Sequence, residues 1–341
     1  MNNNSTGPED VSNAFVPLYG KSWEYFLNRG FTCLCTTTAT VLCTLVLAVA
    51  LFRPKSRTTT NIFIFNLATV TTFQGLTGFS FTVMSLVQTI ADSTVSYGTC
   101  ATLVFIALYA TAVTMWASAA TSVDRCDVLT RPLARWLNRT KAWIVIAFTW
   151  ILPLGLTLPT AIGSWVEIEY RAEDGGLSCY LNPLTSYQFV LFWTVTGVIT
   201  PTIIIVGCFC GIAWAVWDKA KARRHYMDKV SEGGGTFNRI EAQALKITFV
   251  VIGVNVLLVT PFVIVLLLKL DVRKNALPQI VTGILLNVAI VINAVLFAFG
   301  VRSIRKEVRV LCRCRRLIRS EESNVSMKTV FTSRGSTSSA P

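Results

Sequence analysis

Residues 93–126 read STVSYGTCATLVFIALYATAVTMWASAATSVDRC: 31 residues without a charge, Ser93 to Val123, are followed directly by Asp124 and Arg125. A helix needs about 20 predominantly apolar residues to cross the hydrocarbon core of a bilayer. A fixed cation at the mouth of such a span is costly and is seldom retained without a function. The stretch therefore predicts a membrane span with a functional arginine at one end.

The same pattern recurs along the chain of 341 residues, of which 52% are hydrophobic and 14% are charged. That composition is too apolar for an ordinary soluble domain. Charge-free stretches long enough to cross a bilayer occur seven times. We expect an all-α membrane protein, a seven-transmembrane helix bundle, with spans at about residues 31–53, 61–88, 97–126, 142–163, 187–217, 244–268 and 275–300.

The basic residues predict how these spans are oriented. With the amino terminus outside, 25 of the 31 Lys and Arg residues lie in cytoplasmic segments, as the positive-inside rule requires. The net charge of +13 is thus a sign of topology, and we expect no nucleic-acid partner. We expect a multi-pass plasma-membrane protein with an extracellular tail (residues 1–30) and a bundle at residues 31–301. The tail lacks a signal-peptide pattern, so the first span is expected to act as its own targeting signal.

The two ends of the chain carry candidate modification sites. Asn3 and Asn4 begin overlapping glycosylation sequons on the outer side. Residues 315–341 are rich in Ser and Thr, which indicates a disordered, phosphorylatable cytoplasmic tail, or else a merely solvated one.

A segment after the last span has a different character. Residues 302–314 have apolar positions at helical spacing among Arg and Lys, which predicts a short amphipathic eighth helix on the anionic inner leaflet of membrane lipids. Cys312 and Cys314 at its end are candidate palmitoylation sites, or else two unmodified thiols.

Several residues occur at fixed spacings across the predicted spans. Cys100 precedes Arg125 by 25 residues. The other positions are, in chain order, Asn61-Ile62-Phe63, Asn66-Leu67-Ala68, Asp124-Arg125-Cys126, Pro132-Leu133, Trp150, Pro201, Pro261 and Asn293-Ala294-Val295-Leu296-Phe297. As an ordered set they resemble the motifs of the rhodopsin-like (class A) G-protein-coupled receptors. The resemblance extends from about Phe31 to Cys314.

The resemblance implies two pairings. Cys100 and Cys179 would form a disulfide that ties the third span to the second outer loop. Asp124 would pair with Arg125 and hold it in the resting state, with Glu241 as a second acidic partner of the arginine. Alternatively, Glu241 and Arg125 are solvated separately.

The resemblance also implies a switch. Release of Arg125 as the sixth span swings outward would open a cleft for a heterotrimeric G protein. Arrestin and receptor kinases are the partners implied for the Ser/Thr-rich tail. Three further residues occupy positions of the same switch, Cys126, Asn293 and Phe297. Two prolines would act as helix hinges, Pro201 and Pro261.

The sequence departs from the family's pattern at several of these positions. The buried Asp of the second span is Thr71 here, so the family's sodium pocket lacks its anionic ligand. The Pro and Tyr of the seventh-span motif are Ala294 and Phe297. Four further relay positions are replaced, namely Cys43, Phe209, Asn255 and Val259. We therefore expect an unusual activation path, or signalling that is weak, constitutive or absent.

The spans also restrict the unknown extracellular ligand, because their cores contain no Asp, Glu, Lys or Arg. Aminergic receptors need an Asp where this chain has Ala107, and opsins need a retinal-binding Lys where it has Asn287. Acidic ligands would need a cation within the spans. A neutral small molecule is favoured, with a lean to a lipid because Cys126 also occurs in prostanoid receptors; a peptide at the outer loops is the alternative. Five residues would line the pocket, unless they are ordinary packing residues: Thr111, Trp193, Phe262, Gln279 and Asn287.

Other classes of protein fit less well. An enzyme is not expected, since the single His225 lies in a cytoplasmic segment and the sequence has no zinc or paired-aspartate motif. We accordingly expect no cofactor and no metal ion. A transporter would need ionisable residues or broken helices along a pathway. A receptor-fold membrane protein without G-protein signalling is the main rival.

Overall fold

The computed structural model describes residues 23–52, 59–91, 96–131, 136–163, 166, 168–173, 176–181, 185–227 and 276–300, with five isolated positions between 253 and 264. These residues form helices and one β-hairpin. The elements are α1 (Trp23–Phe52), α2 (Thr59–Ala91), α3 (Tyr97–Thr130), α4 (Arg139–Ile162), β1 (Ile168–Glu173), β2 (Gly176–Leu181), α5 (Tyr187–Thr194), η3 (Val195–Ile199), α6 (Thr200–Met227), α8 (Ala276–Val295) and η4 (Leu296–Gly300).

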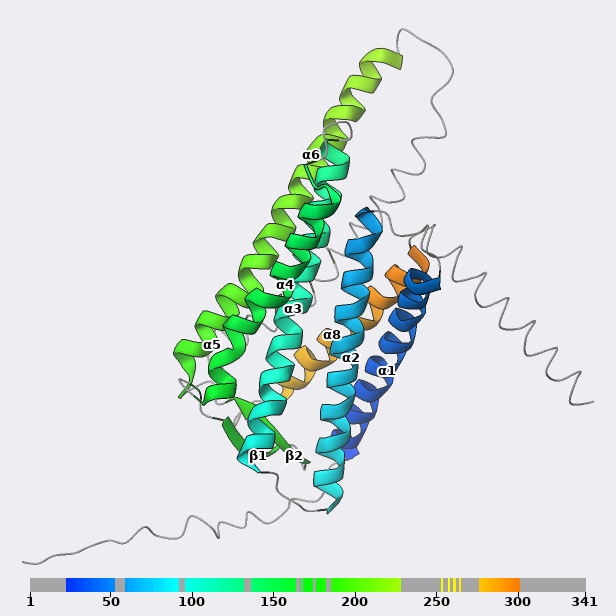
Figure 1. Ribbon diagram of the computed structural model, residues 1–341. Coiled ribbons are helices and arrows are strands. Elements are labelled where there is room, and N and C mark those ends of the chain that lie inside the picture. Colours follow the sequence, from blue (N-terminus) through cyan, green and yellow to red (C-terminus); the bar gives the residue numbers. More distant parts are fainter. Residues whose placement is uncertain are drawn as a thin grey trace, which may run out of the picture.

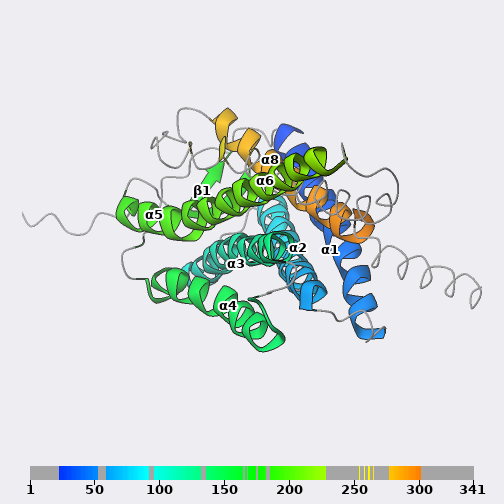
Figure 2. The same ribbon diagram turned by 90° about the horizontal axis from the view of Figure 1, so that it is seen from above.

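The helices pack side by side into a bundle (Figure 1). Seen from above, α3 lies at the centre, and it contacts α2, α4 and α6 (Figure 2). α1 packs between α2 and α8, which brings the first and last described helices together. Five of the described helical segments are long and apolar enough to cross a membrane, and α8 carries a shorter apolar stretch. Most of the predicted sixth span lies outside the described residues.

Local hydrogen bonds define where α3 and α4 begin and end. Ser96 caps α3 by accepting from the backbone N–H of Thr99, and Asn138 caps α4 by accepting from the N–H of Lys141 at 2.9 Å. α4 ends at Gly163, whose φ of 71° is a left-handed conformation that glycine adopts without steric cost. These boundaries follow from the sequence itself.

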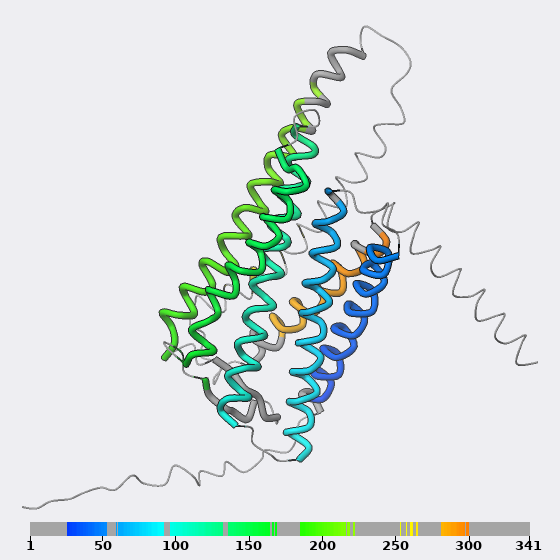
Figure 3. Tube along the Cα trace, viewed as in Figure 1, coloured from blue at the N-terminus to red at the C-terminus, as the bar shows by residue number. Residues whose placement is uncertain are grey.

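The fifth span is interrupted by one π-helical turn. α5, η3 and α6 continue as a single rod (Figure 3), with η3 directly before Thr200 and Pro201. Proline has no backbone N–H and its ring crowds the carbonyl four residues earlier, so the preceding turn must change its hydrogen bonding. The Thr200 hydroxyl donates to the Val195 carbonyl at 2.8 Å and satisfies one of the acceptors in this turn.

The core of the bundle consists of separate apolar clusters along its length. The largest joins α1, α2, α3 and α8 through small buried residues such as Cys43, Ala68 and Ala294. A second joins the beginning of α3 to α5 and to the residues around the hairpin. A third joins the beginnings of α2 and α4 to the last turns of α3. Small side chains at these contacts let the helix backbones approach closely, as is usual in membrane bundles.

Gly75 marks one such close approach, between α1 and α2. A Cβ atom placed there would collide with the Thr40 side chain and lie 3.1 Å from the Thr36 carbonyl oxygen. Gly155 of α4, by contrast, has no neighbour within 4 Å of an added Cβ. An added methyl group would therefore be crowded at Gly75 but not at Gly155, although both glycines lie in apolar helices.

The β-hairpin is an addition to the all-α fold that the sequence predicts. β1 and β2 pair antiparallel, with Ile168 opposite Leu181 and Tyr170 opposite Cys179. The segment IEYRAE alternates apolar and polar residues, which is the period of a strand, and Ile168 is buried against the beginning of α3. The strand β2, which carries Cys179, packs on both α2 and α3.

Candidate functional site

The last turns of α3 carry the acidic-basic pair of the predicted switch. Asp124 is completely buried and Arg125 is half-buried. A carboxylate that is taken out of water needs charged or hydrogen-bonding neighbours, so its burial is costly unless those groups are nearby. This end of α3 is therefore built around an ionisable group and cannot be explained as apolar packing alone.

Asp127, one turn after Asp124, connects α3 to the following segment. Its carboxylate oxygens accept from the backbone N–H groups of Trp136 at 3.3 Å and Leu137 at 2.9 Å. Asp127 is nearly buried, and the Leu137 side chain is fully buried against α2 and α4. The side chain thus anchors the segment between α3 and α4 beside the switch.

Cys126 lies on the side of α3 that faces α6. Its sulfur would lie 3.5 Å from a Cβ atom added at Gly211, and the thiol of Cys208 of α6 is its neighbour. Both thiols are free. Two small, weakly polar side chains therefore occupy the contact between α3 and α6 near the predicted switch.

The middle of the bundle contains an uncharged hydrogen-bonded cluster. The Thr114 hydroxyl donates to the Gln74 amide oxygen at 2.9 Å, which joins α3 to α2. Thr71, at the position of the family's buried Asp, is 2% exposed and bonds to the carbonyl of Leu67 in its own helix at 2.8 Å. The cluster holds neutral side chains where the family's pattern would place a carboxylate, and the described residues contain no group of metal-binding side chains.

The predicted ligand-pocket residues have different surroundings. Trp193 of α5 is 2% exposed and packs among apolar residues of α3, including Ala112 and Met115. Thr111 donates to the carbonyl of Ala107 at 2.9 Å, within its own helix. Both residues are thus engaged by helix packing or by local hydrogen bonds.

Asn287 of α8 reaches the first span. Its amide donates to the Gly283 carbonyl at 2.8 Å and to the Thr32 hydroxyl at 3.4 Å. The bond to Thr32 joins α8 to α1 through two residues that are 255 positions apart in the chain. The amide at this position therefore helps α1 and α8 to pack.

Cys100 lies in the first turn of α3, at the end of the bundle where the hairpin packs, and it is disulfide-bonded. The pairing with Cys179 stays a prediction. Both hinge prolines lie in helical backbone, Pro201 in α6 and Pro261 among the isolated described positions. Asn293 is buried in α8.

The remaining predicted site residues fall wholly or partly outside the described structure. The backbone, but not the side chain, is described for Cys179, Gln279 and Phe297. Neither is described for Asn3, Asn4, Glu241, Phe262, Cys312 and Cys314, nor for the predicted eighth helix.

Sequence reasoning missed Asp127 and the contact between Trp150 and Asn66. The Trp150 indole N–H donates to the Asn66 side-chain oxygen at 3.0 Å, which joins α4 to α2. A signal for Asp127 was available, because an acidic residue in the last turns of a span rarely lacks a local partner. No comparable signal pairs Asn66 with Trp150, which are 84 positions apart.

Comparisons with known proteins agree with this architecture. The family model described as 7 transmembrane receptor (rhodopsin family) matches residues 43–296. The crystal structure of squid rhodopsin superposes with a TM-score of 0.69 at 18% identity, covering 84% of each chain, which establishes a shared fold, a seven-helix bundle.

Sequence relatives cover less of the molecule. Rhodopsin of Sminthopsis crassicaudata is 29% identical over 185 residues, 52% of this chain and 51% of that protein. The mesotocin receptor of Rhinella marina is 25% identical over 155 residues, 41% of this chain and 39% of that receptor. The chain thus spans about half the length, or less, of these curated relatives.

Proposed function

The chain belongs to the rhodopsin family of seven-transmembrane receptors, and we propose that it is a plasma-membrane receptor that passes an extracellular signal to a heterotrimeric G protein. The family is a receptor family and not an enzyme class, and its apolar helices make this a multi-pass membrane protein. The observation that carries the proposal is the buried Asp124 beside Arg125 at the end of α3.

The proposed orientation puts the amino terminus outside and the end of α3 in the cytosol. The excess of Lys and Arg in the segments on that side supports it. The disulfide-bonded Cys100 and the hairpin lie at the opposite end, which would face the oxidising exterior. We propose that Cys179 is the partner of Cys100, since β2 packs against α3.

In the proposed mechanism, Asp124 and Glu241 hold Arg125 until the sixth span moves outward. A charge pair in a partly dehydrated site shifts a two-state equilibrium when it breaks. Asp127 would keep the segment from Trp136 onward in place beside the cleft during this motion. Cys126, on the side facing α6, would let α3 and α6 slide past each other.

We propose that the residues that connect the ligand pocket to the Arg125 switch are uncharged. Thr71, Thr114 and Gln74 would replace the sodium-binding carboxylate. The π-helical turn η4 begins at Leu296, two residues after Ala294, where the family's pattern has a proline, and would supply the deformable point of the seventh span.

The proposed ligand is a neutral or lipid-like small molecule, and a peptide is the alternative. Asn287 stands where an opsin needs its lysine, so retinal attachment through a Schiff base is not proposed. Arrestin and receptor kinases are proposed partners of the Ser/Thr-rich tail, with glycosylation at Asn3 and Asn4 and palmitoylation at Cys312 and Cys314. A receptor-fold protein with constitutive or no G-protein signalling is the second candidate, favoured by the replaced relay residues.

The test is nucleotide exchange on each major class of G protein, measured in membranes with verified surface expression of the receptor. Basal exchange above that of mock membranes is expected in at least one class. Arg125→Ala should reduce it at least tenfold, which corresponds to about 1.4 kcal/mol, whereas Asp218→Ala, which removes an exposed charge from α6, should leave it unchanged. Absence of exchange in every class would support the non-signalling alternative.

A further inference from the structure

Two thiols from different helices meet where α3 packs on α6, near the Arg125 switch. The Cys126 sulfur would lie 3.5 Å from a Cβ atom added at Gly211, and the thiol of Cys208 is its neighbour. Cys208 precedes Gly211 by three residues, and residues at this spacing share one face of a helix. A disulfide requires Cβ atoms about 4 Å apart, and the glycine allows the two backbones to approach toward that spacing.

Apolar packing holds α3 and α6 together beside the two thiols. Ala119 of α3 and Ile205 of α6 are each 2% exposed and form a cluster, against which Phe209 packs. The two helices also lie side by side when the bundle is seen from above (Figure 2). The thiols are therefore neighbours within an extended helix contact, which keeps them close to each other.

The two ends of α3 differ in the redox state of their cysteines. Cys100 is disulfide-bonded and lies at the end proposed to face the exterior, whereas Cys126 and Cys208 are free and half-buried near the end proposed to face the cytosol. Disulfides that form in the cytosol are transient and serve catalysis or redox sensing. Redox-sensing cysteines are accessible and lie next to a second cysteine, which is the arrangement of the free pair.

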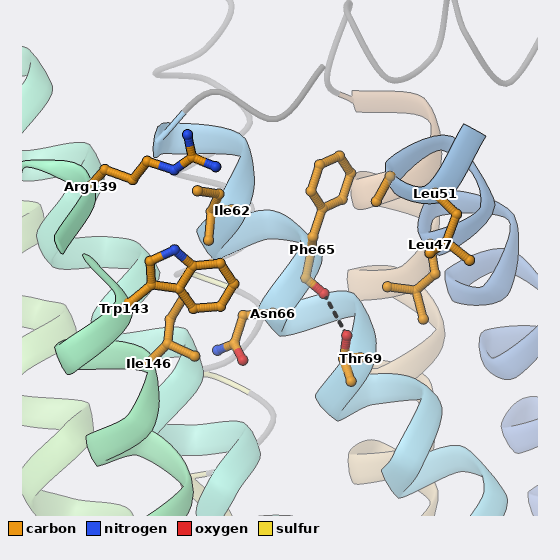
Figure 4. A pocket seen from close by; sticks show the side chains of 10 residues that line it. Leu47, Leu51, Ile62, Phe65, Asn66, Thr69, Arg139, Trp143 and Ile146 are labelled. Atoms are coloured by element: carbon orange, nitrogen blue, oxygen red, sulfur yellow. Dashed lines mark hydrogen bonds between the residues drawn. The ribbon is translucent and has the colours of Figure 1, made fainter. Parts of the chain in front are cut away.

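The size of the oxidant is restricted, because the thiols do not line a cavity that the structure describes. A cavity of about 420 Å³ is lined by residues of α1, α2 and α4, such as Leu47, Asn66 and Arg139, and by none of α6 (Figure 4). Cys126 instead follows the half-buried Arg125, a cation whose burial is costly unless water or other polar groups are nearby. Hydrogen peroxide is uncharged and needs little more room than water does.

We propose that hydrogen peroxide oxidises Cys126 and Cys208 to a reversible disulfide that links α3 to α6 beside the Arg125 switch. The Cys126 sulfur attacks one peroxide oxygen; an S–O bond forms, the O–O bond breaks, and the first water leaves with the thiol proton. The Cys208 sulfur then attacks the Cys126 sulfur; the S–S bond forms, the S–O bond breaks, and a second water leaves with the Cys208 proton. The two thiols lose two electrons, which reduce one peroxide to two waters.

The disulfide acts on the motion proposed for these helices. In the proposed function, α3 and α6 slide past each other when Arg125 is released, and a covalent bond between them opposes that sliding. Oxidation therefore lowers G-protein coupling, and cytosolic thiols restore it by thiol–disulfide exchange. The effect on coupling rests on the proposed function, whereas formation of the bond does not.

The first test identifies the bond. The full-length chain in nanodiscs is treated with hydrogen peroxide, and its unreduced proteolytic peptides are identified by mass spectrometry. A cross-link between Cys126 and Cys208 is expected, and dithiothreitol should remove it. Cys210→Ser is the matched control for Cys208→Ser, because Cys210 is also free but is exposed, and residues two apart do not share a helix face. The cross-link should form in Cys210→Ser and be absent in Cys208→Ser.

The second test measures what the bond does, with each chain compared with its own untreated sample. Peroxide should raise the unfolding temperature of the wild-type chain by about 5 °C, because a disulfide restricts the unfolded state. Nucleotide exchange should fall about fivefold. Cys210→Ser should respond like the wild-type chain, and Cys208→Ser should show neither change.

Three results would overturn the proposal: both thiols stay reduced in peroxide, Cys126 is joined to Cys210, or the cross-link forms and exchange persists unchanged. The cross-link is sought in the wild-type chain, so this test does not depend on the folding of a variant. A cross-linked chain that unfolds at a higher temperature, but supports no exchange in any G-protein class before or after treatment, would refute the proposed function and leave the disulfide established.

Discussion

Asp127 accepts a hydrogen bond from the backbone N–H of Leu137, ten positions later, at 2.9 Å. The bond joins the end of α3 to the segment that leads into α4. Leu137 is fully buried against α2 and α4, so the bond and the apolar contact hold the same segment. The carboxylate two residues after Arg125 therefore determines the local shape of the cytoplasmic surface proposed to receive the G protein.

Asp127→Ala should destabilise the receptor and weaken G-protein coupling. Two N–H groups lose a charged acceptor, and an unsatisfied partner costs about 1–3 kcal/mol. Thermal unfolding and nucleotide exchange should both fall. Asp218→Ala removes an exposed carboxylate from α6 and should leave the unfolding temperature unchanged; equal effects of the two substitutions would contradict the role of Asp127.

Gly75→Ala should destabilise the contact between α1 and α2. The added Cβ collides with Thr40 in a packed interface, and overpacking of this kind costs about 1–3 kcal/mol. Gly155→Ala has open space and should be neutral or slightly stabilising, because alanine favours a helix by up to about 1 kcal/mol over glycine. The comparison is made by thermal unfolding in detergent, and a Gly75→Ala chain as stable as Gly155→Ala would refute the close approach.

Trp150→Phe should lower the stability of the bundle by about 1–2 kcal/mol, because it keeps an aromatic ring but removes the N–H that the Asn66 oxygen accepts. Trp214→Phe serves as the control, since Trp214 is 74% exposed on α6. If both substitutions shift the unfolding temperature alike, the hydrogen bond between α2 and α4 contributes nothing specific.

Sodium should not act as a specific effector of this receptor. A cation site in the middle of the bundle needs an anionic oxygen ligand, and Thr71, Gln74 and Thr114 are neutral. Replacing NaCl by KCl at constant ionic strength should change neither basal exchange nor the unfolding temperature. Thr71→Asp should introduce a sodium-dependent increase in stability; a response to sodium in the wild-type chain would show that another site exists.

Cys100→Ser and Cys179→Ser should reduce surface expression to the same extent, and the double variant should be no worse than either, because a disulfide is lost once. Cys210→Ser, which removes a free and exposed thiol, should have no effect. Additive losses in the double variant would mean that Cys100 has another partner. Surface labelling of an extracellular epitope measures all four variants.

The helical class and most of the spans were predictable from the sequence, because a bilayer demands long apolar segments whose backbone bonds are satisfied internally. The predicted spans 97–126 and 142–163 miss the last turn of α3, which ends at Thr130, and the first turn of α4, which begins at Arg139. The caps Ser96, Asn138 and Gly163 define these helices through bonds within a few residues of their own position. The hairpin was not predicted. Strand pairing joins two short segments across a turn, and the alternating pattern in IEYRAE is too short to stand out in a loop.

The candidate site was only partly predictable. Asp124 and Arg125 could be singled out because charges at the mouth of an apolar span are rare. Asn287 and Trp193 were predicted to line a ligand pocket. In the structure, Asn287 bonds to Thr32 and Trp193 packs in an apolar cluster, and neither contact could be predicted from the sequence. Position along a helix predicts which face a side chain occupies, but its neighbours come from other helices.

The sequence alone thus determined that this chain crosses the membrane several times and that Asp124 and Arg125, the proposed switch, follow its third apolar span. These properties depend on hydropathy, charge and spacing, which are local in the chain. Only the tertiary structure decided which polar groups meet: Asp127 with Leu137, Thr114 with Gln74, and Trp150 with Asn66. It also placed Cys126 beside Cys208, because two helices that are distant in sequence pack against each other there.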